Sequence, residues 1–264
     1  MPFLRVNDIV IHYIDEGHKD SPVILFSNSL GTDFRIWDGV VRNLKDNFRV
    51  IRYDKRGHGL SSCPEAPYSI SDHVKDLTAI IDYLDVRDIT VVGLSVGGLI
   101  AQGLYSFHPK LIKAIILADT AHKILTKDIW NSRIETVNKL GLEALADGTM
   151  ERWFSESYHK KHSEDLEGAR NMFVRTPVTG YIGTCTAIRD ADLTSVAKNI
   201  SVPVLCLVGS EDGSTPPEVV REMSELIPNS EFYIINDSGH LPCLERPSEF
   251  TKLIVNFLHR NNIY

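Results

Sequence analysis

The stretch ITVVGLSVGGLIAQGLYSFH, residues 89–108, decides the fold. Its first six residues are mostly apolar and β-branched, as in a buried strand, and the residues from Val96 onward have the spacing of a helix that stops at Pro109. Ser95 lies at the junction, with Gly93 and Gly97 two residues to either side. A serine on so sharp a turn takes a strained backbone, and flanking side chains would collide where strand and helix converge. The stretch predicts a nucleophile elbow; a structural glycine-rich turn is the alternative.

Outward from this stretch, apolar β-branched runs alternate with amphipathic segments, which is typical of a mostly parallel sheet covered by helices on both faces. The other runs are 9–14, 23–28, 48–53, 113–118, 202–209 and 231–236. Helices are expected at 71–85 with Ser71 as N-cap, at 96–108, at 217–227 and at 247–260. The runs 9–14 and 23–28 are joined by a short polar turn and predict an antiparallel entry hairpin.

Between about His122 and Lys198 the strand pattern disappears, and four or five helical stretches follow one another. The β pattern resumes at Val202, so the segments before and after belong to one sheet. We therefore expect a core made of residues 1–121 and 199–264, and a helical cap, residues 122–198, inserted over the carboxyl edge of the sheet, where open α/β sheets bind ligands.

Composition narrows the function classes. The net charge is −7 and no run of Lys or Arg forms a basic face, which argues against a nucleic-acid partner. No apolar run approaches the roughly 20 residues that span a bilayer, and the N-terminal stretch lacks the apolar segment of a signal peptide. The four cysteines have no metal-ligand spacing, so we expect reduced thiols, a cytoplasmic location and no metal.

A serine nucleophile needs a base, and in this chain order the base follows the last strands. His240, just after the run 231–236, is the candidate; His58, in the loop KRGHGLS, is its rival. The orienting acid is expected after the run 202–209, where Asp212 fits a Gly-x-x-Asp-x-x-x-Pro pattern counted from residue 209. Glu211 is adjacent, and Asp119, at the end of the run 113–118, is the second choice.

The oxyanion formed on attack needs donors preset to where negative charge develops. The backbone N–H of Val96, at the start of the helix after the serine, is one candidate. The other is the N–H of Leu30, in the turn Asn28-Ser29-Leu30-Gly31 that follows the run 23–28. The turn stands in for a usual His-Gly pair, and Asn28 occupies the place of the histidine, which leaves open which hydrogen bonds support the turn.

With these loops placed, the whole chain resembles the α/β-hydrolase superfamily, whose fold is a mostly parallel eight-stranded sheet with flanking helices and an inserted helical cap. Within it, the chain is similar to the 3-oxoadipate enol-lactonases of the β-ketoadipate pathway. The segments that carry this closer resemblance are SNSLGTDFRIWD, RYDKRGHGLSS, VGLSVGGLIAQGL, MERWF, GYIGTCTAIRDADL and GHLPCLERP. The core motifs are shared by many hydrolases, so the two cap segments, MERWF and GYIGTCTAIRDADL, discriminate.

The resemblance implies hydrolysis of 3-oxoadipate enol-lactone to 3-oxoadipate through an acyl-serine, in aromatic-acid catabolism and without a cofactor. The partner is a small-molecule lactone that carries a carboxylate; the oligomeric state is not indicated. A carboxylesterase, a C–C hydrolase or a perhydrolase of the same fold is the first alternative, and a non-catalytic ligand receptor is the second. Ser95 argues against the dehalogenases and epoxide hydrolases of this fold, whose nucleophile is aspartate.

A protein of net charge −7 must bind the substrate carboxylate through a local cation. Arg133 is the candidate because it falls on an apolar stripe of helical spacing and could point into the cap. The same spacing is equally compatible with an Arg133 side chain that extends to solvent or pairs with an acidic neighbour. Arg189 is the next candidate, and Trp153 is expected either as an apolar wall or as a core residue. The stripe consists of Trp130, Ile134, Val137 and Leu140.

Overall fold

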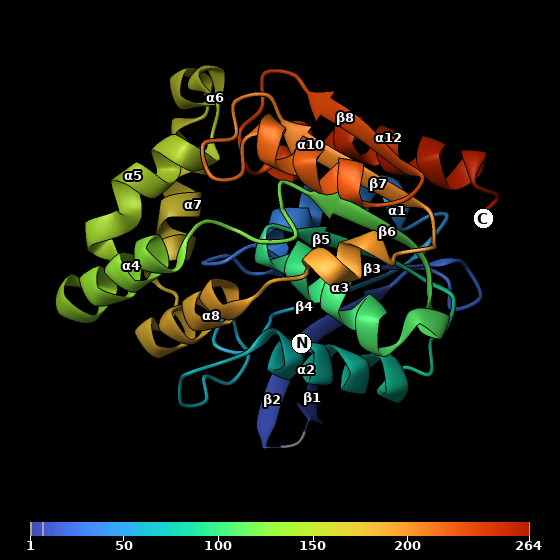
Figure 1. The fold of residues 1–264 in the computed structure, drawn as a ribbon, viewed down its shortest axis with the longest axis horizontal. Coiled ribbons are helices and arrows are strands. Elements are labelled where there is room, and N and C mark those ends of the chain that lie inside the picture. The colour runs from blue at the N-terminus through green and yellow to red at the C-terminus, as the bar shows by residue number, and fades with distance from the viewer. Residues whose placement is uncertain (1, 7, 264) are drawn as a thin grey trace.

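The computed structural model describes residues 2–6 and 8–263. In this part of the chain eight strands form one sheet, in the order β1-β2-β4-β3-β5-β6-β7-β8 (Figure 1). The strands are β1 (Phe3–Val6), β2 (Ile9–Glu16), β3 (Val23–Ser27), β4 (Arg49–Tyr53), β5 (Ile89–Leu94), β6 (Ile112–Ala118), β7 (Val204–Gly209) and β8 (Ser230–Ile235). From β4 to β8 neighbouring strands are parallel, and only the β1–β2 and β2–β4 pairs are antiparallel. The predicted fold class is confirmed.

Helices cover both faces of this sheet. α2 packs on α3, and α9 contacts both α3 and α10, on one face, whereas α1 packs on α12 on the other (Figure 1). The helices outside the insert are η1 (Phe34–Trp37), α1 (Asp38–Leu44), α2 (Ile70–Tyr83), α3 (Val96–Phe107), η2 (Pro109–Leu111), α10 (Pro217–Leu226), α11 (Pro242–Glu245) and α12 (Pro247–Arg260). Those of the insert are α4 (Lys127–Leu140), α5 (Glu143–Trp153), α6 (Glu156–Lys161), α7 (Ser163–Val174), α8 (Val178–Asp190) and α9 (Thr194–Lys198).

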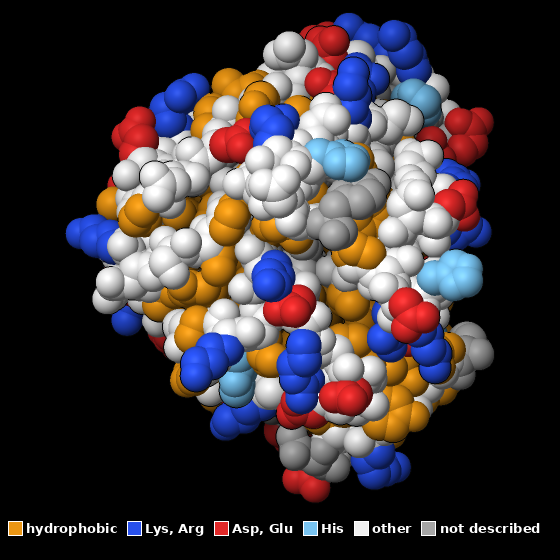
Figure 2. Space-filling view, turned by 90° about the vertical axis from the view of Figure 1, so that its right-hand side faces the viewer, with side chains coloured by type: hydrophobic (Ala, Val, Ile, Leu, Met, Phe, Trp, Pro, Cys, Tyr) orange, Lys and Arg blue, Asp and Glu red, His pale blue; other side chains and the backbone are white. Residues whose placement is uncertain are grey.

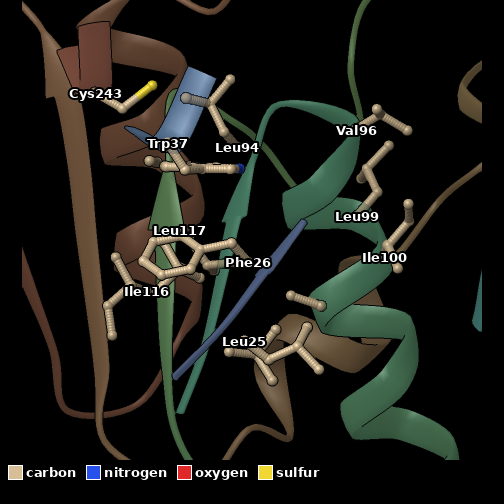
Figure 3. Packing of buried hydrophobic residues seen from close by; sticks show 14 of the residues in the cluster. Leu25, Phe26, Trp37, Leu94, Val96, Leu99, Ile100, Ile116, Leu117 and Cys243 are labelled. Carbon is tan, nitrogen blue, oxygen red and sulfur yellow. The ribbon is translucent and has the colours of Figure 1, made fainter. Parts of the chain in front are cut away.

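The core lies on both sides of the central strands. All six residues of β5 are buried: α3 packs against β5, and η1 contacts the neighbouring strand β3. Figure 3 shows Leu99 and Ile100 of α3 on one side, and Phe26 with Trp37 on the other. The ring centroids of Phe26 and Trp37 are 4.7 Å apart. Burial of each large apolar side chain contributes about 1.5–3 kcal/mol, so this packing fixes the position of the β5–α3 junction.

Two local predictions are wrong. The runs 9–14 and 23–28 do not form a hairpin: β4 lies between β2 and β3, and the antiparallel partner of β2 on its other edge is β1, which the sequence pattern did not reveal. The N-cap of α2 is Ser69 and not Ser71. The hydroxyl of Ser69 accepts from the N–H of Asp72, whose carboxylate accepts from the N–H of Ser69, forming a capping box.

Residues 122–198 contain six helices, where the sequence predicted four or five. The two shortest, α6 and α9, have six and five residues, too few to show a clear apolar period. Figure 1 shows α4 to α8 gathered at one side of the molecule. On the face turned away from them, acidic and basic side chains intermix (Figure 2). None of the helices in the described residues is long and apolar enough to cross a membrane.

Candidate active site

Ser95 occupies the turn between β5 and α3. Its φ is +57° and its ψ is −119°, a left-handed conformation that a residue with a side chain rarely adopts. Two hydrogen bonds hold Ser95 there. The N–H of Ser95 donates to the carbonyl of Ala118 (3.0 Å), and the carbonyl of Ser95 accepts from the hydroxyl of Thr120 (2.6 Å). Strain of this kind costs on the order of 1–3 kcal/mol and persists where the surroundings enforce it.

The glycines beside Ser95 are required by close backbone approach. A Cβ on Gly93 would lie 2.3 Å from the carbonyl oxygen of Gly97, and a Cβ on Gly97 would lie 2.0 Å from that of Ser27. Neither contact can relax, because backbone atoms form the opposing surface. The sequence argument for glycine at these positions therefore has a direct steric basis.

His240 and Asp212 form a buried pair on the loops after β8 and β7. The Nδ1 of His240 lies 3.0 and 2.9 Å from the two carboxylate oxygens of Asp212, and both residues are at most 3% exposed. Asp212 also accepts from the N–H groups of Ser214 (2.7 Å) and Thr215 (3.1 Å) and from the Thr215 hydroxyl (2.8 Å). Burial alone would raise the pKa of Asp212, but His240 and these donors outweigh it and hold the pKa below its usual value.

The two rival acids are placed differently. Glu211 is exposed, and its carboxylate accepts from the N–H of Glu156 (2.9 Å). Asp119 is fully buried behind Asp212; one of its oxygens accepts from the N–H of Gly209 (2.9 Å), and the other has no partner among the described residues. Burial, and then the charge of Asp212, raise the pKa of Asp119 well above its usual value. The pair with His240 is formed by Asp212.

Asp119, Asp212 and His240 are also the only group of three metal-capable side chains that meets in the described part of the chain, with their ligand atoms within 4.8 Å of one another. The Nδ1 of His240 and both oxygens of Asp212 are already engaged in hydrogen bonds. The donor set therefore fits an acid–base pair better than a metal centre.

The turn after β3 faces Ser95 and carries the N–H of Leu30. This N–H makes no hydrogen bond within the described residues, and Val96, the first residue of α3, has a free N–H by helix geometry. Asn28 supports the turn in place of the usual histidine. Its amide donates to the carbonyl of Tyr53 (3.0 Å) and accepts from the indole N–H of Trp37 (2.8 Å). Tyr53 and Trp37, both buried, therefore provide the hydrogen bonds that support this turn through Asn28.

His58, the rival base, lies behind the same turn. It is fully buried, its Nε2 accepts from the N–H of Gly31 (3.0 Å), and its Nδ1 lies 3.2 Å from the carbonyl of Arg56. Both ring nitrogens are thus used to hold backbone, and His58 does not line the cavity at Ser95.

A cavity of about 290 Å³ joins the site to the insert. Ser95 and His240 line it together with side chains of α4, α5 and α8. The residues that line it are Ser29, Leu30, Ser95, Ile124, Leu125, Ile129, Trp130, Arg133, Arg152, Trp153, Tyr181, Ile188, Gly213, Ser214, Thr215 and His240.

Two arginines reach this cavity. Arg133 donates to the hydroxyl of Tyr181 (3.2 Å) and stands 5.2 Å from the ring of Trp130. Arg152 donates to the hydroxyl of Thr149 (3.2 Å). Neither guanidinium forms an ion pair within the described residues, although the protein is rich in carboxylates. Burial, and then the charge of Arg133, lower the pKa of Arg152. The cavity thus presents two partly buried, uncompensated positive charges.

Of the other two residues that the sequence suggested for substrate binding, one lines the cavity and one does not. Trp153 is buried, lines the cavity and packs edge-on against Phe173 with ring centroids 5.6 Å apart. Arg189 does not line the cavity; it pairs with Asp190 (2.7 Å) and bonds Asn131. Leu140, expected on the apolar stripe, is 68% exposed because it ends α4. Arg152 was missed: its only sequence signal is its place beside Trp153 in the segment MERWF.

Comparisons with known proteins agree with the fold. The family model for the alpha/beta hydrolase fold matches residues 22–247. Two 3-oxoadipate enol-lactonases of Acinetobacter baylyi are 32% and 35% identical to the chain, over 98% and 92% of its length and 97% and 90% of theirs. The crystal structure of an enol-lactonase from Burkholderia xenovorans superposes with a TM-score of 0.94 at 36% identity, covering 98% of this chain and all of that one.

Proposed function

Because the chain belongs to the α/β-hydrolase family, we propose that it is a serine hydrolase that opens 3-oxoadipate enol-lactone to 3-oxoadipate in aromatic-acid catabolism, with residues 122–198 as its cap. The observation that carries the proposal is a single cavity lined both by Ser95 and His240 and by the uncompensated Arg133 and Arg152. Ester chemistry needs the first pair, and a substrate with a free carboxylate needs the second. The enol-lactonase relatives support the substrate.

In the first half-reaction the Oγ of Ser95 attacks the lactone carbonyl, and the Nε2 of His240 takes its proton. Asp212 holds the Nδ1–H tautomer, which leaves Nε2 free to accept. No hydrogen bond joins Ser95 to His240 in the described residues, and such contacts tighten when substrate binds. The N–H groups of Leu30 and Val96 stabilise the oxyanion. Collapse breaks the ring C–O bond. The enol oxygen leaves while still attached to the acyl chain and takes the proton from His240, whose Nε2 is then free to accept again.

In the second half-reaction water attacks the acyl-serine. His240 takes a proton from that water, the Ser95 ester bond breaks, and the proton returns to Ser95. The released enol tautomerises to the ketone, which draws the reaction forward. The chemistry of both steps needs only the side chains and N–H groups already named.

Turnover of the enol-lactone tests the function. The purified protein should show a higher kcat/KM for the enol-lactone than for p-nitrophenyl acetate, and Ser95→Ala should lower kcat for both by at least about 10³-fold while the circular dichroism spectrum is unchanged. Preference for the acetate ester would favour a general carboxylesterase. Binding without turnover would favour a receptor.

The carboxylate contact has its own test. Arg133→Ala and Arg152→Ala should each lower kcat/KM for the enol-lactone about 10- to 100-fold, because a charge-assisted hydrogen bond is worth roughly 1.5–3 kcal/mol. Activity on p-nitrophenyl acetate, which has no carboxylate, should hardly change. Arg189→Ala is the matched control, since Arg189 belongs to the same insert but lies outside the cavity. Equal losses on both substrates would contradict the assignment.

A further inference from the structure

Lys55 is a buried cation with no acidic partner. It follows β4, is 1% exposed, and forms no ion pair within 4.0 Å in the described part of the chain. Its Nζ donates to the carbonyl of Ser29 (2.5 Å) and to that of Thr32 (3.3 Å). Burial of an ammonium group is costly unless hydrogen bonds compensate it. Its two carbonyl partners bracket Leu30 in the turn that faces Ser95.

The geometry of the peptide bond gives this contact a consequence. The carbonyl of Ser29 and the N–H of Leu30 belong to one peptide group, which is planar and trans, so the two point in opposite directions. A carbonyl held by Lys55 therefore aims the Leu30 N–H away from Lys55. That N–H has no partner among the described residues, and Leu30 lines the cavity with Ser95. His58 holds the next peptide group through the N–H of Gly31 (3.0 Å).

We propose that Lys55 is a positioning residue of the oxyanion hole: by holding the carbonyl of Ser29 it orients and polarises the N–H of Leu30 toward the substrate oxyanion. The inference rests on the proposed serine-hydrolase function. A positive charge on the carbonyl oxygen withdraws electron density from its peptide group and strengthens the opposite N–H as a donor. Lys55 acts through the backbone and does not touch the substrate.

The side chain of Lys55 changes its charge state near neutral pH. Burial lowers its pKa to about 7, against the opposing effect of Asp54 and Asp33. Its other charged or titratable neighbours are Arg56, His58 and His73. Burial, and then the charge of Lys55, keep the pKa of His58 well below its usual value and lower that of His73 to about 3. The two histidines therefore remain neutral at neutral pH. Lys55 is charged below a pH of about 7 and is the group behind the turn that supplies a cation there.

The test compares Lys55→Met with Tyr105→Phe, which removes a buried hydroxyl bonded to Ser201 (3.0 Å) far from the turn. Lys55→Met should lower kcat for the enol-lactone about 10- to 100-fold, since loss of one oxyanion donor costs about 10²–10³, and should change KM less than threefold. Affinity for a trifluoromethyl ketone, which adds to a serine and places an oxyanion in the hole, should fall by the same factor as kcat. Tyr105→Phe should change none of these.

Values of kcat and ketone affinity within threefold of wild type would overturn the proposal, as would a loss confined to KM. Should Lys55→Met not fold, Lys55→Gln, which keeps donors but not the charge, is judged by the same criteria. A failure of the proposed serine-hydrolase function would give a different result. The wild-type protein would then neither turn over the lactone nor bind the ketone, and Ser95→Ala would behave like wild type.

Discussion

At the scale of single residues, the sequence predicts the groups whose role is written into a local turn. The proposed catalytic residues Ser95, Asp212 and His240 each follow a strand, in motifs of fewer than ten residues. The structure pairs Asp212 with His240 and places Ser95 and His240 on one cavity. Arg152 could not be found in this way, because its place in the cavity depends on the packing of α5 against α4 and on no local pattern. The support of the turn by Tyr53 and Trp37 is likewise non-local.

Asp212 and Asp119 can be separated by isosteric substitution. Asp212→Asn should lower kcat about 10³- to 10⁴-fold, because an amide no longer fixes the Nδ1–H tautomer of His240. Asp119→Asn should change kcat less than about tenfold, because its contact is to the N–H of Gly209 and an amide oxygen can still accept it. Steady-state kinetics on the enol-lactone measure kcat of both variants. A larger loss of kcat in Asp119→Asn than in Asp212→Asn would show that the acid is misplaced.

At the scale of elements, the end of α5 is tied to the two loops that carry Asp212 and His240. The N–H of Gly213 donates to the carbonyl of Arg152 (3.2 Å), and the N–H of Leu241 donates to that of Trp153 (3.3 Å). Glu245 of α11 joins the same parts, accepting from the N–H of Gly239 (2.7 Å) and from the hydroxyl of Ser155 (2.5 Å). The end of α5 therefore shares backbone hydrogen bonds with the loops of the proposed acid and base.

Loss of this connection should be costly. Glu245→Ala leaves the buried N–H groups of Gly239 and Ser155 without a partner and should lower the free energy of unfolding by about 2–4 kcal/mol. It should also lower kcat on p-nitrophenyl acetate, because the loop of His240 loses its anchor. Urea unfolding and steady-state kinetics measure the two effects. Glu249→Ala, at an exposed position of α12, is the control; equal behaviour of the two variants would contradict the role.

At the scale of the whole molecule, sheet order is the feature that sequence reasoning reached least well. The mostly parallel sheet, its flanking helices and the run of helices between β6 and β7 follow from the alternation of apolar runs. The neighbours of β2 do not. Its pairing with β4 joins segments far apart in the sequence, and β1 has only four residues, too few to show a clear strand pattern. The short helices α6 and α9 are not predicted from the sequence for a related reason: tertiary contacts, and not a local pattern, fix them.

The buried Asp119 should also leave a mark on global stability. Its raised pKa means that, above the ordinary aspartate pKa, the native state binds more protons at this site than the unfolded state. Stability from this group therefore falls as pH rises, by up to about 1.4 kcal/mol per pH unit. The stability of Asp119→Asn relative to wild type should increase from pH 5 to pH 7 in urea unfolding. A difference independent of pH would contradict the raised pKa.

The central claim is that Ser95 carries the opened lactone as an ester, and one measurement tests it most directly. Wild-type protein is mixed with excess enol-lactone, quenched in acid within milliseconds, digested and analysed by mass spectrometry. Because ring opening expels no fragment, the peptide that contains Ser95 should gain the mass of the whole lactone, and the gain should be absent from Ser95→Ala. Turnover that proceeds with the adduct on another residue, or undiminished in Ser95→Ala, would contradict the account.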